Sequence, residues 1–342
     1  MQEEWQWLNK IVPDMQDKLI NRYRFLDAIS RFQPIGRRTL ATKMRVTERV
    51  MRTETELLKE FNLISIDKIG MQTTSEGIQV LAKLKGTIDL LLGRKHRAEQ
   101  LRSCLGIARC LIVSGNADTQ PEVLSAMGKA ASDLLQDELP LGPSVVSVMG
   151  GSTMVSVAEC LTPALARNRE LTFVPARGGI GEAPALQANT ISAKMAEQTG
   201  SQYHSLFIPE SISQEAIDSL RLDPGIRDVM KLIKSSNIVI HGIGEAIQMA
   251  KRRQMSPELI ETLKKRQAVG EAFGYFFDKS GQIVYKLPRI GLQLEDLAEM
   301  DFVLAVAGGP QKAAAIQAYA KIAPKQTWLI TDEGAADTIL KK

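Results

Sequence analysis

The feature that most restricts the fold of this chain is a repeating pattern after Leu105, in which apolar runs lead through glycine-containing turns into amphipathic stretches. Short apolar runs bounded by turn signals predict buried strands, and the longer stretches between them predict helices. The alternation predicts an α/β fold with a mostly parallel sheet and helices on both faces. We expect strands at residues 109–113, 145–149, 171–174, 205–208, 238–240, 302–307 and 327–330, helices at 121–139, 154–161, 187–198, 226–235, 312–322 and 335–340, and an antiparallel insertion at 273–292.

The turns after these strands would gather at the carboxyl edge of the sheet, where folds of this class bind ligands. Glycine-rich turns follow the strands at 149–153, 175–179, 241–245, 307–312 and 331–334. Such turns are weak evidence by themselves, because tight strand-to-helix connections favour glycine for steric reasons. No Gly-x-Gly-x-x-Gly fingerprint opens the first unit and no Walker lysine follows a glycine loop, so a nucleotide cofactor is poorly supported.

Three of the turns carry side chains that suit an anionic ligand. Ser152 and Thr153 would place hydroxyl and backbone N–H groups at the start of a helix, which is a favourable position for an anion. Lys312 would lie in the first turn of its helix, where a positive charge is unfavourable because the helix dipole is positive there. A bound anion would offset this cost. Arg177 precedes two glycines at the end of a strand, where a guanidinium can face a ligand. The pattern favours two separate anionic groups, as in a phosphorylated sugar, over coincidental turn chemistry.

A second pattern, at residues 34–70, predicts a winged helix-turn-helix. A short helix at 39–44 precedes Thr47, a favourable N-cap with Glu48 in the first turn of a helix expected to reach residue 61. Residues 63–66 and 71–73 alternate like two strands around a turn, with Lys68 at its tip. We expect the second helix to pack through one apolar face, formed by Val46, Val50, Leu57 and Phe61.

Arginines occupy a different face of that second helix, at steps of four and three residues. Arg45, Arg49 and Arg52 could there bond guanine edges and phosphates in a major groove. A solvated helix face is the alternative, but residues 31–59 carry eight Lys or Arg against three Asp or Glu, which favours a polyanionic partner. The predicted interface with double-stranded DNA comprises Arg37, Arg38, Thr39, Arg45, Thr47, Glu48, Arg49, Arg52 and Lys68.

The charge distribution supports this division of the chain. Residues 1–100 carry 18 Lys or Arg and 13 Asp or Glu, whereas the whole chain has a net charge of only +4. We therefore expect a basic DNA-binding domain at 1–74 and a nearly neutral effector domain at 104–342. Between them, residues 75–103 carry a helical stripe of Val80, Leu84, Ile88 and Leu91, which predicts either a dimerisation helix or a connector.

The remaining composition excludes several other classes of protein. The three cysteines and three histidines show no metal-ligand or redox spacing, so we expect no metal and no cofactor. The amino terminus lacks the pattern of a signal peptide, and no apolar run is long enough to cross a bilayer. A cytoplasmic location and no membrane partner are expected.

Several motifs together resemble a known family. They are residues 34–38, 173–179, 187–190, 239–246, 271–275 and 305–309. Over essentially its whole length the chain resembles the SorC-type sugar-binding transcriptional regulators, and most of all the branch that controls central glycolytic genes. The resemblance implies a repressor with a Rossmann-like effector domain, related to phosphosugar isomerases and deaminases but without their chemistry. It implies fructose 1,6-bisphosphate as effector and, as target, the operator of the operon headed by glyceraldehyde-3-phosphate dehydrogenase.

The effector site that this resemblance implies can be matched residue by residue. Arg253 directly follows Arg252, and either of the two arginines could be the one that matches the family contact. Ser152 occupies a position where relatives carry threonine, and its side chain keeps the hydroxyl group. One phosphate would be held by Gly150, Gly151, Ser152 and Thr153, and the sugar and its other phosphate by Arg177, Gln187, Arg252, Glu271 and Lys312.

These expectations lead to one mechanism and two rivals. Two dimers would hold the operator as a tetramer, and the bisphosphate would weaken the contact between the dimers. One rival is a phosphosugar isomerase or deaminase in which Glu245, Glu271 and Asp332 shuttle protons. The other is an activator that responds to a different sugar phosphate.

Overall fold

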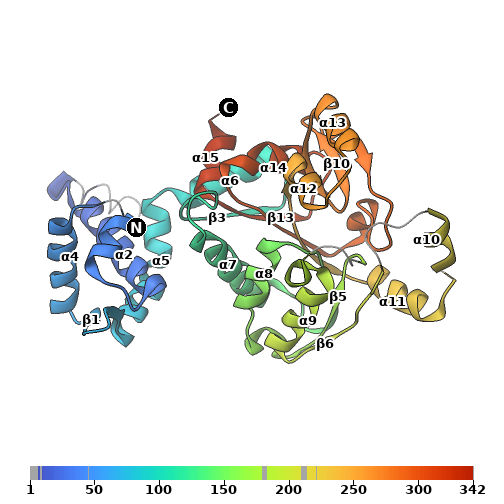
Figure 1. Ribbon diagram of the computed structural model, residues 1–342. Helices are drawn as coiled ribbons and strands as arrows, with labels where there is room; N and C mark the ends of the chain where they lie inside the picture. The colour runs from blue at the N-terminus through green and yellow to red at the C-terminus, as the bar shows by residue number, and fades with distance from the viewer. Residues whose placement is uncertain are drawn as a thin grey trace. The chain divides into compact units, whose positions relative to one another are not determined.

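The computed structural model describes residues 7, 10–44, 46–178, 183–208, 214–220 and 222–341. The chain forms two compact units, residues 1–96 and 97–342, which are described separately (Figure 1). Arg45 and Gly179, both part of the predicted motifs, lie outside the described residues. Within the described part, no helix is both long and apolar enough to cross a membrane.

The first unit has the order of elements expected of a winged helix-turn-helix. Helix α2 (Met15–Phe32) precedes α3 (Arg37–Met44) and α4 (Glu48–Glu60), and the wing follows as an antiparallel pair, β1 (Ile64–Ile66) with β2 (Met71–Thr73). Helix α5 (Ser75–Leu91) closes the unit. Their apolar faces meet in one core, which includes Phe25, Leu26, Ile29, Leu40, Met51, Leu58, Ile64 and Met71.

Helix α4 begins where the sequence predicts, but it buries a different face. The Thr47 hydroxyl caps the helix by accepting the Val50 N–H. Val50 and Phe61, expected in the core, are 44% and 59% exposed. The buried residues are instead Met51, Thr55 and Leu58. Thr55 can be buried because its hydroxyl donates to the Met51 carbonyl at 2.8 Å, a local bond that a pattern of apolar residues does not reveal.

The tip of the wing is a tight turn built around Asp67. Its carboxylate accepts the N–H groups of Ile69 and Gly70, at 2.8 and 3.0 Å. Gly70 has φ +146°, and a Cβ there would lie 2.8 Å from the Ile35 nitrogen, so only glycine fits. Lys68 and Ile69 are exposed at the tip, as the sequence predicts for Lys68.

The helical stretch predicted at 75–103 is interrupted. Helix α5 ends at Leu91, and after Leu92 and Gly93 a second helix, α6 (Arg94–Leu105), begins. Leu101 and Leu105 of α6 are buried in the core of the second unit. The stripe of Val80, Leu84, Ile88 and Leu91 therefore lies on α5 alone, and Gly93 separates it from α6.

The second unit contains a seven-stranded parallel sheet, in the order β3-β13-β12-β7-β4-β5-β6. The chain winds outward from β4 through β5 to β6, and then in the opposite direction from β7 through β12 to β13. β4 and β7 are therefore the neighbours at which the winding reverses. The strands are β3 (Arg109–Val113), β4 (Gly142–Val148), β5 (Arg169–Pro175), β6 (Gln202–Tyr203), β7 (Ile238–Gly242), β12 (Phe302–Val306) and β13 (Thr327–Asp332).

Helices cover both faces of this sheet, as predicted (Figure 1). One face packs against α7 (Glu122–Glu138), α8 (Ser152–Cys160) and α9 (Ala188–Thr199). The other packs against α6, α14 (Ala313–Ala320) and α15 (Glu333–Leu340). Outside the insertion, the other described helical segments of the second unit are η1 (Pro163–Ala166), η2 (Pro184–Leu186), α10 (Gln214–Leu220), α11 (Pro224–Lys234), η3 (Glu295–Glu299) and η4 (Pro310–Lys312).

One predicted strand is misplaced. The sequence predicts a strand at residues 205–208, whereas the structure has none there and the nearby strand β6 is the earlier pair Gln202–Tyr203. The side chain of Asn189 explains the difference, because it accepts the Leu206 N–H and donates to the Leu206 carbonyl, at 2.8 and 3.0 Å. These backbone groups bond to a helix side chain instead of to a neighbouring strand.

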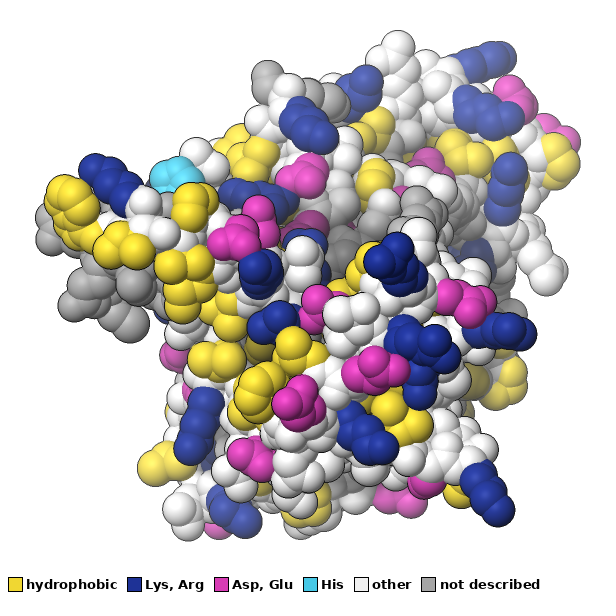
Figure 2. Space-filling view, turned by 90° about the vertical axis from the view of Figure 1, so that its left-hand side faces the viewer, with side chains coloured by type: hydrophobic (Ala, Val, Ile, Leu, Met, Phe, Trp, Pro, Cys, Tyr) yellow, Lys and Arg dark blue, Asp and Glu magenta, His cyan; other side chains and the backbone are white. Residues whose placement is uncertain are grey.

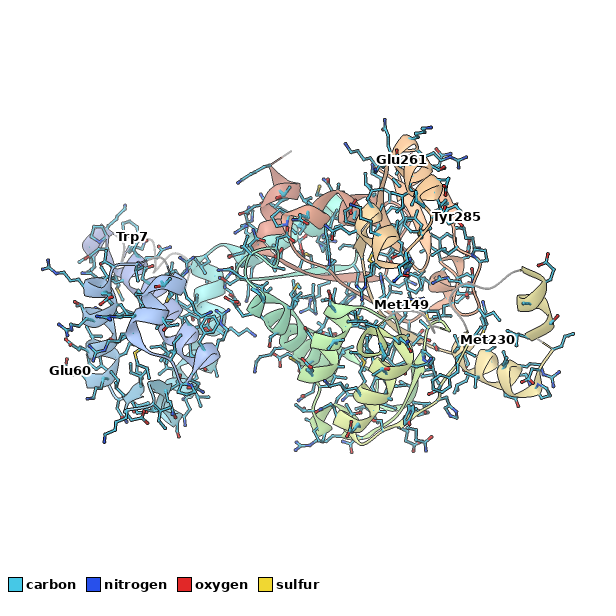
Figure 3. The ribbon with its side chains drawn as sticks, in the orientation of Figure 1. Trp7, Glu60, Met149, Met230, Glu261 and Tyr285 are labelled. Atoms are coloured by element: carbon cyan, nitrogen blue, oxygen red, sulfur yellow. The ribbon has the colours of Figure 1, made fainter. Side chains whose placement is uncertain are left out.

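The predicted antiparallel insertion is present and begins earlier than expected. It contains α12 (Ala246–Arg252) and α13 (Pro257–Lys265), and its four-stranded sheet has the order β11-β10-β9-β8. Figure 3 marks this region by Glu261 and Tyr285, with Met149 at the end of β4 below it. The strands are β8 (Gly244–Glu245), β9 (Ala268–Ala272), β10 (Tyr275–Asp278) and β11 (Ile283–Lys286).

The insertion returns to the main sheet at the end of β5. The Leu292 N–H donates to the Ala176 carbonyl at 2.7 Å, and the Gly178 N–H donates to the Ile290 carbonyl at 3.1 Å. The insertion is thereby held against the carboxyl edge of the parallel sheet, which is the edge where the predicted ligand residues lie.

Candidate functional site

A pocket of about 230 Å³ lies at the carboxyl edge of the sheet, where the loops after β4 and β7 meet. Doubly wound sheets bind ligands at such a reversal of winding. Four basic side chains line this pocket against two acidic ones. They are Arg177, Arg252, Arg253 and Lys312 against Glu245 and Glu271.

A larger cavity of about 590 Å³ lies at the opposite edge, around the starts of β4 and β5. Its charged lining residues are Arg169 and Glu170. The Arg169 guanidinium is engaged in structure, because it donates to the carbonyls of Gln136, Leu139 and Leu165 near the end of α7 and in η1. The smaller pocket, with its surplus of cations, is therefore the better candidate for an anionic ligand.

The loop after β4 forms the first anion-binding pole of the pocket. Gly151, with φ +121°, turns the chain into α8, so that Ser152 and Thr153 occupy the first turn of a nine-residue helix. The first N–H groups of a helix have no acceptor within it and attract anions. Gly150 is needed for close packing, because a Cβ there would lie 2.5 Å from the Leu186 carbonyl oxygen.

Lys312 brings a cation to the same pocket from the loop after β12. Burial lowers the pKa of Lys312, whereas attraction to Asp118 opposes that shift. The loop is fixed from two sides: the Asp332 carboxylate accepts the Gly309 N–H at 3.0 Å, and Asp118 accepts the Gln311 N–H at 2.9 Å. The position of the Lys312 backbone is therefore set by contacts that need no ligand.

A second pole is formed by Arg177, Arg253 and Glu271. Arg253 Nη1 lies 3.1 Å from Glu271 Oε1, with both side chains at most 6% exposed. Glu271 Oε1 also accepts the Gly274 N–H at 2.6 Å. Burial raises the pKa of Glu271, but attraction to Arg253, the bond from Gly274 and attraction to Arg177 together leave that pKa below its ordinary value. Glu271 is therefore ionised at neutral pH.

The structure brings together eight of the nine predicted effector residues. Gln187 is the exception: it is half-buried before α9 and is not among the described lining residues. Arg252 and Arg253 both line the pocket, so neither match is excluded. The residues brought together are Gly150, Gly151, Ser152, Thr153, Arg177, Arg252, Glu271 and Lys312.

The three acids considered as proton shuttles all serve the backbone. Glu245 accepts the N–H groups of Ile247 and Gln248 at the start of α12. Asp332 accepts the N–H groups of Ala117, Gly309 and Ala335. Glu271 is held by Gly274 and Arg253, so each carboxylate already has a structural role.

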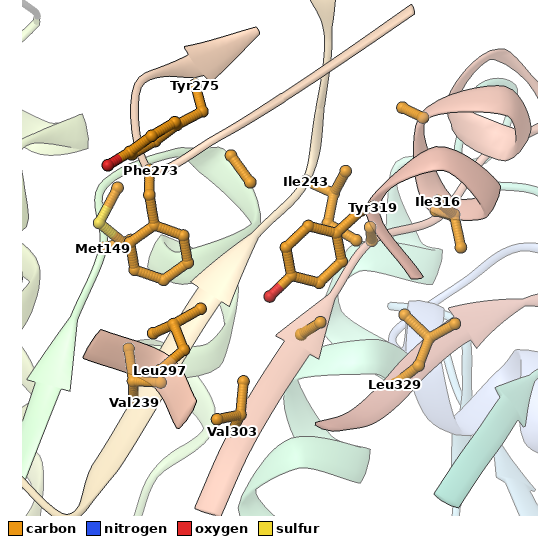
Figure 4. Close-up of a cluster of buried hydrophobic side chains, with 14 of the residues drawn as sticks. Met149, Val239, Ile243, Phe273, Tyr275, Leu297, Val303, Ile316, Tyr319 and Leu329 are labelled. Atoms are coloured by element: carbon orange, nitrogen blue, oxygen red, sulfur yellow. The ribbon is translucent and has the colours of Figure 1, made fainter. Parts of the chain in front are cut away.

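Apolar and aromatic side chains form the floor of the pocket. Figure 4 shows Met149, Phe273 and Tyr275 side by side within the core of the second unit. Next to Phe273, His241 donates from Nδ1 to the Gly242 carbonyl at 3.0 Å, and its Nε2 accepts the Tyr319 hydroxyl at 2.9 Å. Burial lowers the pKa of His241 to about 4, so the ring is neutral at physiological pH.

Sequence reasoning missed two groups near this pocket. Phe273 lines it and lies 4.8 Å from the His241 ring, centre to centre. Arg289 is buried beside Glu271, although it is not among the lining residues. Phe273 lies within the 271–275 motif, which indicates only Glu271 as a ligand residue, and Arg289 belongs to no motif or periodic pattern in the sequence.

The residues of the predicted DNA interface that the structure describes all lie on the first unit. Their side chains are exposed to solvent, except that of Arg37, which is partly exposed. Glu56 lies 3.8 Å from Arg37 and 3.7 Å from Arg52, and Glu48 lies 3.3 Å from Arg38. Figure 2 views the side on which α4 lies and shows basic, acidic and exposed hydrophobic side chains intermingled. Arg49 forms no ion pair with another described residue.

Within the described residues, no group of three or more His, Cys, Asp or Glu could hold a metal ion.

Two family models match the two units of the chain. Residues 19–88 match the family described as "CggR N-terminal DNA binding domain". Residues 91–341 match the family described as "Putative sugar-binding domain". The boundary between the two matches falls close to the division between the compact units.

Similar proteins span nearly the whole chain. It is 42% identical over 332 residues to the central glycolytic genes regulator of Priestia megaterium, covering 97% of this chain and 96% of that one. The protein of the same name in Bacillus subtilis is 42% identical, with 97% of each chain covered. A crystal structure of a SorC family transcriptional regulator from Enterococcus faecalis is 50% identical, with a TM-score of 0.68, and covers 72% of this chain and 99% of that one.

Proposed function

The chain belongs to the SorC family of sugar-binding transcriptional regulators, in its central glycolytic genes regulator branch, and we propose that it represses a glycolytic operon until fructose 1,6-bisphosphate binds. It is a regulator with a DNA-binding domain and a sugar-binding domain, not an enzyme. The target that we propose is the operator of the operon headed by glyceraldehyde-3-phosphate dehydrogenase.

The observation that carries the choice of effector is the presence of two cationic poles in one pocket. The α8 amino terminus with Lys312 suits one phosphate, and the arginines near Glu271 suit a second. Glu271 would accept a sugar hydroxyl, since it is ionised and lines the pocket. A bisphosphate engages both poles, whereas a monophosphate leaves one cationic pole without its anion.

For operator recognition, we propose that α4 enters a major groove. Arg49 and Arg52 would contact base edges or phosphates there, and Lys68 would contact a phosphate from the wing. Arg37, Arg38, Thr39, Arg45, Thr47 and Glu48 complete the proposed interface. The exposure of the described members supports this assignment, because a buried arginine could not reach DNA.

For regulation, we propose that dimers assemble in pairs on the operator and that the bisphosphate weakens the contact between them. A ligand shifts such an equilibrium only through different affinities for the two states, typically by ~1–3 kcal/mol. The location of the protein that we propose is the cytoplasm, where the metabolite and the operator both occur.

A mobility shift on the upstream region of the glycolytic operon tests the proposal. The expected result is a high-order complex that loses affinity when fructose 1,6-bisphosphate is added. Unchanged complexes at millimolar bisphosphate would rule out this effector. A reporter gene fused to the same region then decides the sign: deletion of the regulator raises expression from a repressed operon and lowers it from an activated one.

A further inference from the structure

A hydrogen bond between two glutamine side chains links the insertion to the loop after β12, next to the candidate pocket. The Gln248 side chain, on α12, donates from Nε2 to Oε1 of Gln311 at 2.8 Å. Gln248 lines the pocket, whereas Gln311, in η4, is not among the described lining residues. Both residues are exposed and uncharged, and neither is one of the predicted effector residues.

Gln311 lies on a loop that the rest of the second unit already fixes. Its backbone N–H donates to the Asp118 carboxylate at 2.9 Å, and the Gly309 N–H donates to Asp332 at 3.0 Å. The residue after Gln311 is Lys312, which lines the pocket. A side chain that bonds to Gln311 is therefore held close to the loop that carries Lys312.

The other partner of the bond lies on the pocket face of α12. Gln248 and Arg252 are four residues apart on this helix, so they lie on one face of it, and both line the pocket. Ala246 and Ala250 of the same helix are buried in a small core that belongs to the insertion, separate from the two cores of the main sheet. The bond to Gln311 therefore ties a helix of the insertion, and Arg252 with it, to a loop of the main sheet.

This arrangement keeps two positive charges close together. Burial lowers the pKa of Lys312; attraction to Asp118 opposes that shift, and repulsion from Arg252 adds to it. The Nη2 atom of Arg252 is buried and has no hydrogen-bond partner among the described residues. Two neighbouring cations, one with an unused buried donor, suit a single phosphate group. A bond between neutral amides can oppose their repulsion without competing with the phosphate, as a carboxylate would.

We propose that Gln248 and Gln311 form a neutral clamp that holds Arg252 beside Lys312, so that both cations bind the same phosphate group of the ligand. This role rests on the proposed sugar-phosphate function and extends it to a positioning residue, Gln311, outside the pocket lining. It also assigns Arg252 to the pole that Lys312 forms with the start of α8, and leaves Arg253 to the other pole.

Gln311→Met breaks the clamp without changing a residue that lines the pocket. The thioether is a weak acceptor, so the bond from Gln248 is lost while the length of the side chain is kept. Calorimetry with fructose 1,6-bisphosphate should show an affinity about fivefold lower than that of the wild type, as expected for the loss of one hydrogen bond. Gln282→Met is the matched control, because Gln282 is an exposed residue of the same insertion that does not line the pocket, and its affinity should equal that of the wild type.

Two double variants test whether the glutamines act together and through Arg252. Gln248→Met combined with Gln311→Met should bind no more weakly than Gln248→Met alone, because either change removes the same bond. In an Arg252→Ala background, Gln311→Met should cause no further loss, since no guanidinium is left to position. Thermal shifts at high bisphosphate concentration measure the weak binding of this background. A general structural role of the bond would instead cost about fivefold with and without Arg252.

The outcomes separate this inference from the function on which it rests. If the wild type binds no bisphosphate, the proposed function fails. If the wild type binds and Gln311→Met binds equally well, the clamp fails and the function stands. A higher affinity in Gln311→Met would also overturn the clamp, because the bond would then have to open to admit the ligand. Additive losses from Gln248→Met and Gln311→Met would show that the two side chains act separately.

Discussion

Arg253 Nη1 lies 3.1 Å from Glu271 Oε1, and this ion pair is buried beside the carboxyl edge of the parallel sheet. A buried ion pair in a pocket contributes little to stability relative to apolar packing, because both ions lose their hydration. The proposed effector would give this pair a role, since a phosphate can exchange for the carboxylate at the guanidinium.

Arg177→Ala and Lys312→Ala should each give a regulator that binds operator DNA normally but no longer responds to fructose 1,6-bisphosphate. Each removes one cation from a pole of the pocket and leaves the first unit unchanged. Mobility shifts with and without the sugar measure the response, and Lys194→Ala, which breaks an exposed pair with Glu159, is the control. A variant that loses operator binding while its sugar affinity stays normal would refute the assignment of the pocket.

Arg49→Ala should weaken operator binding by roughly 1–3 kcal/mol if Arg49 contacts a base. The expected loss is specific, so affinity for an unrelated duplex changes little. Lys68→Ala should instead weaken binding to both duplexes and reduce the salt dependence, as loss of a phosphate contact does. Titrations of both duplexes at several salt concentrations distinguish the two cases, and an Arg49→Ala loss that is equal on both would reassign Arg49 to the phosphates.

Glu56→Gln should increase affinity for DNA of any sequence. Glu56 lies within 3.8 Å of both Arg37 and Arg52, so its neutralisation releases two arginines toward phosphate. Glu60→Gln is the control, because Glu60 is exposed on the same helix and forms no ion pair with a described residue. Equal affinities of wild type and Glu56→Gln on a non-specific duplex would show that these contacts are too weak to matter.

Gly70→Ala should destabilise the first unit by about 1–3 kcal/mol, the usual cost of a strained backbone conformation. The residue has φ +146°, and its new Cβ would meet the Ile35 backbone at 2.8 Å. Gly36→Ala provides the control, since nothing lies within 4 Å of its Cβ position. Denaturant unfolding of the two variants should separate them clearly, and similar midpoints would contradict the described wing.

The second unit should lose stability between about pH 6.5 and pH 4, on account of His241. Its pKa is lowered to about 4 by burial, so the unfolded chain binds a proton in this range and the folded chain does not. The free energy of unfolding has its full value, as far as His241 is concerned, above pH 6.5. It falls by on the order of 3 kcal/mol as the pH drops from about 6.5 to about 4. His241→Gln should flatten the pH dependence of unfolding, which denaturant titrations at several pH values measure, and an unchanged slope would contradict the assignment.

Much of this architecture is predictable because its signals are local. Short apolar runs, separated by amphipathic stretches, locate six of the seven parallel strands. Thr47 indicates the start of α4, because its side chain caps the helix through a residue only three positions away. The errors occur where a polar side chain bonds backbone groups, because a pattern of apolar residues does not show such bonds. Asn189 bonds the backbone of Leu206 and displaces the edge strand, and Thr55 takes a core position through its own helix.

Some residues of the candidate site can likewise be predicted from the sequence and others cannot. Glycine turns and the placement of Lys312 and Arg177 indicate the pocket, because strand order brings the carboxyl ends together. Arg289 and Phe273 come from an insertion whose path back to β5 no periodic pattern specifies. Their proximity to Glu271 and His241 follows from long-range contacts and is visible only in three dimensions.

The contacts of the Asp332 carboxylate bear on the affinity of the regulator for its effector. By accepting N–H groups from three separate segments, at Ala117, Gly309 and Ala335, it fixes the loop that carries Lys312 through contacts within the protein. A receptor that is rigid beforehand spends little binding energy on ordering loops, so the affinity for an effector can be strong even in a small cavity. Such preorganisation allows a signal to depend on metabolite concentration alone and not on slow folding of the receptor around it.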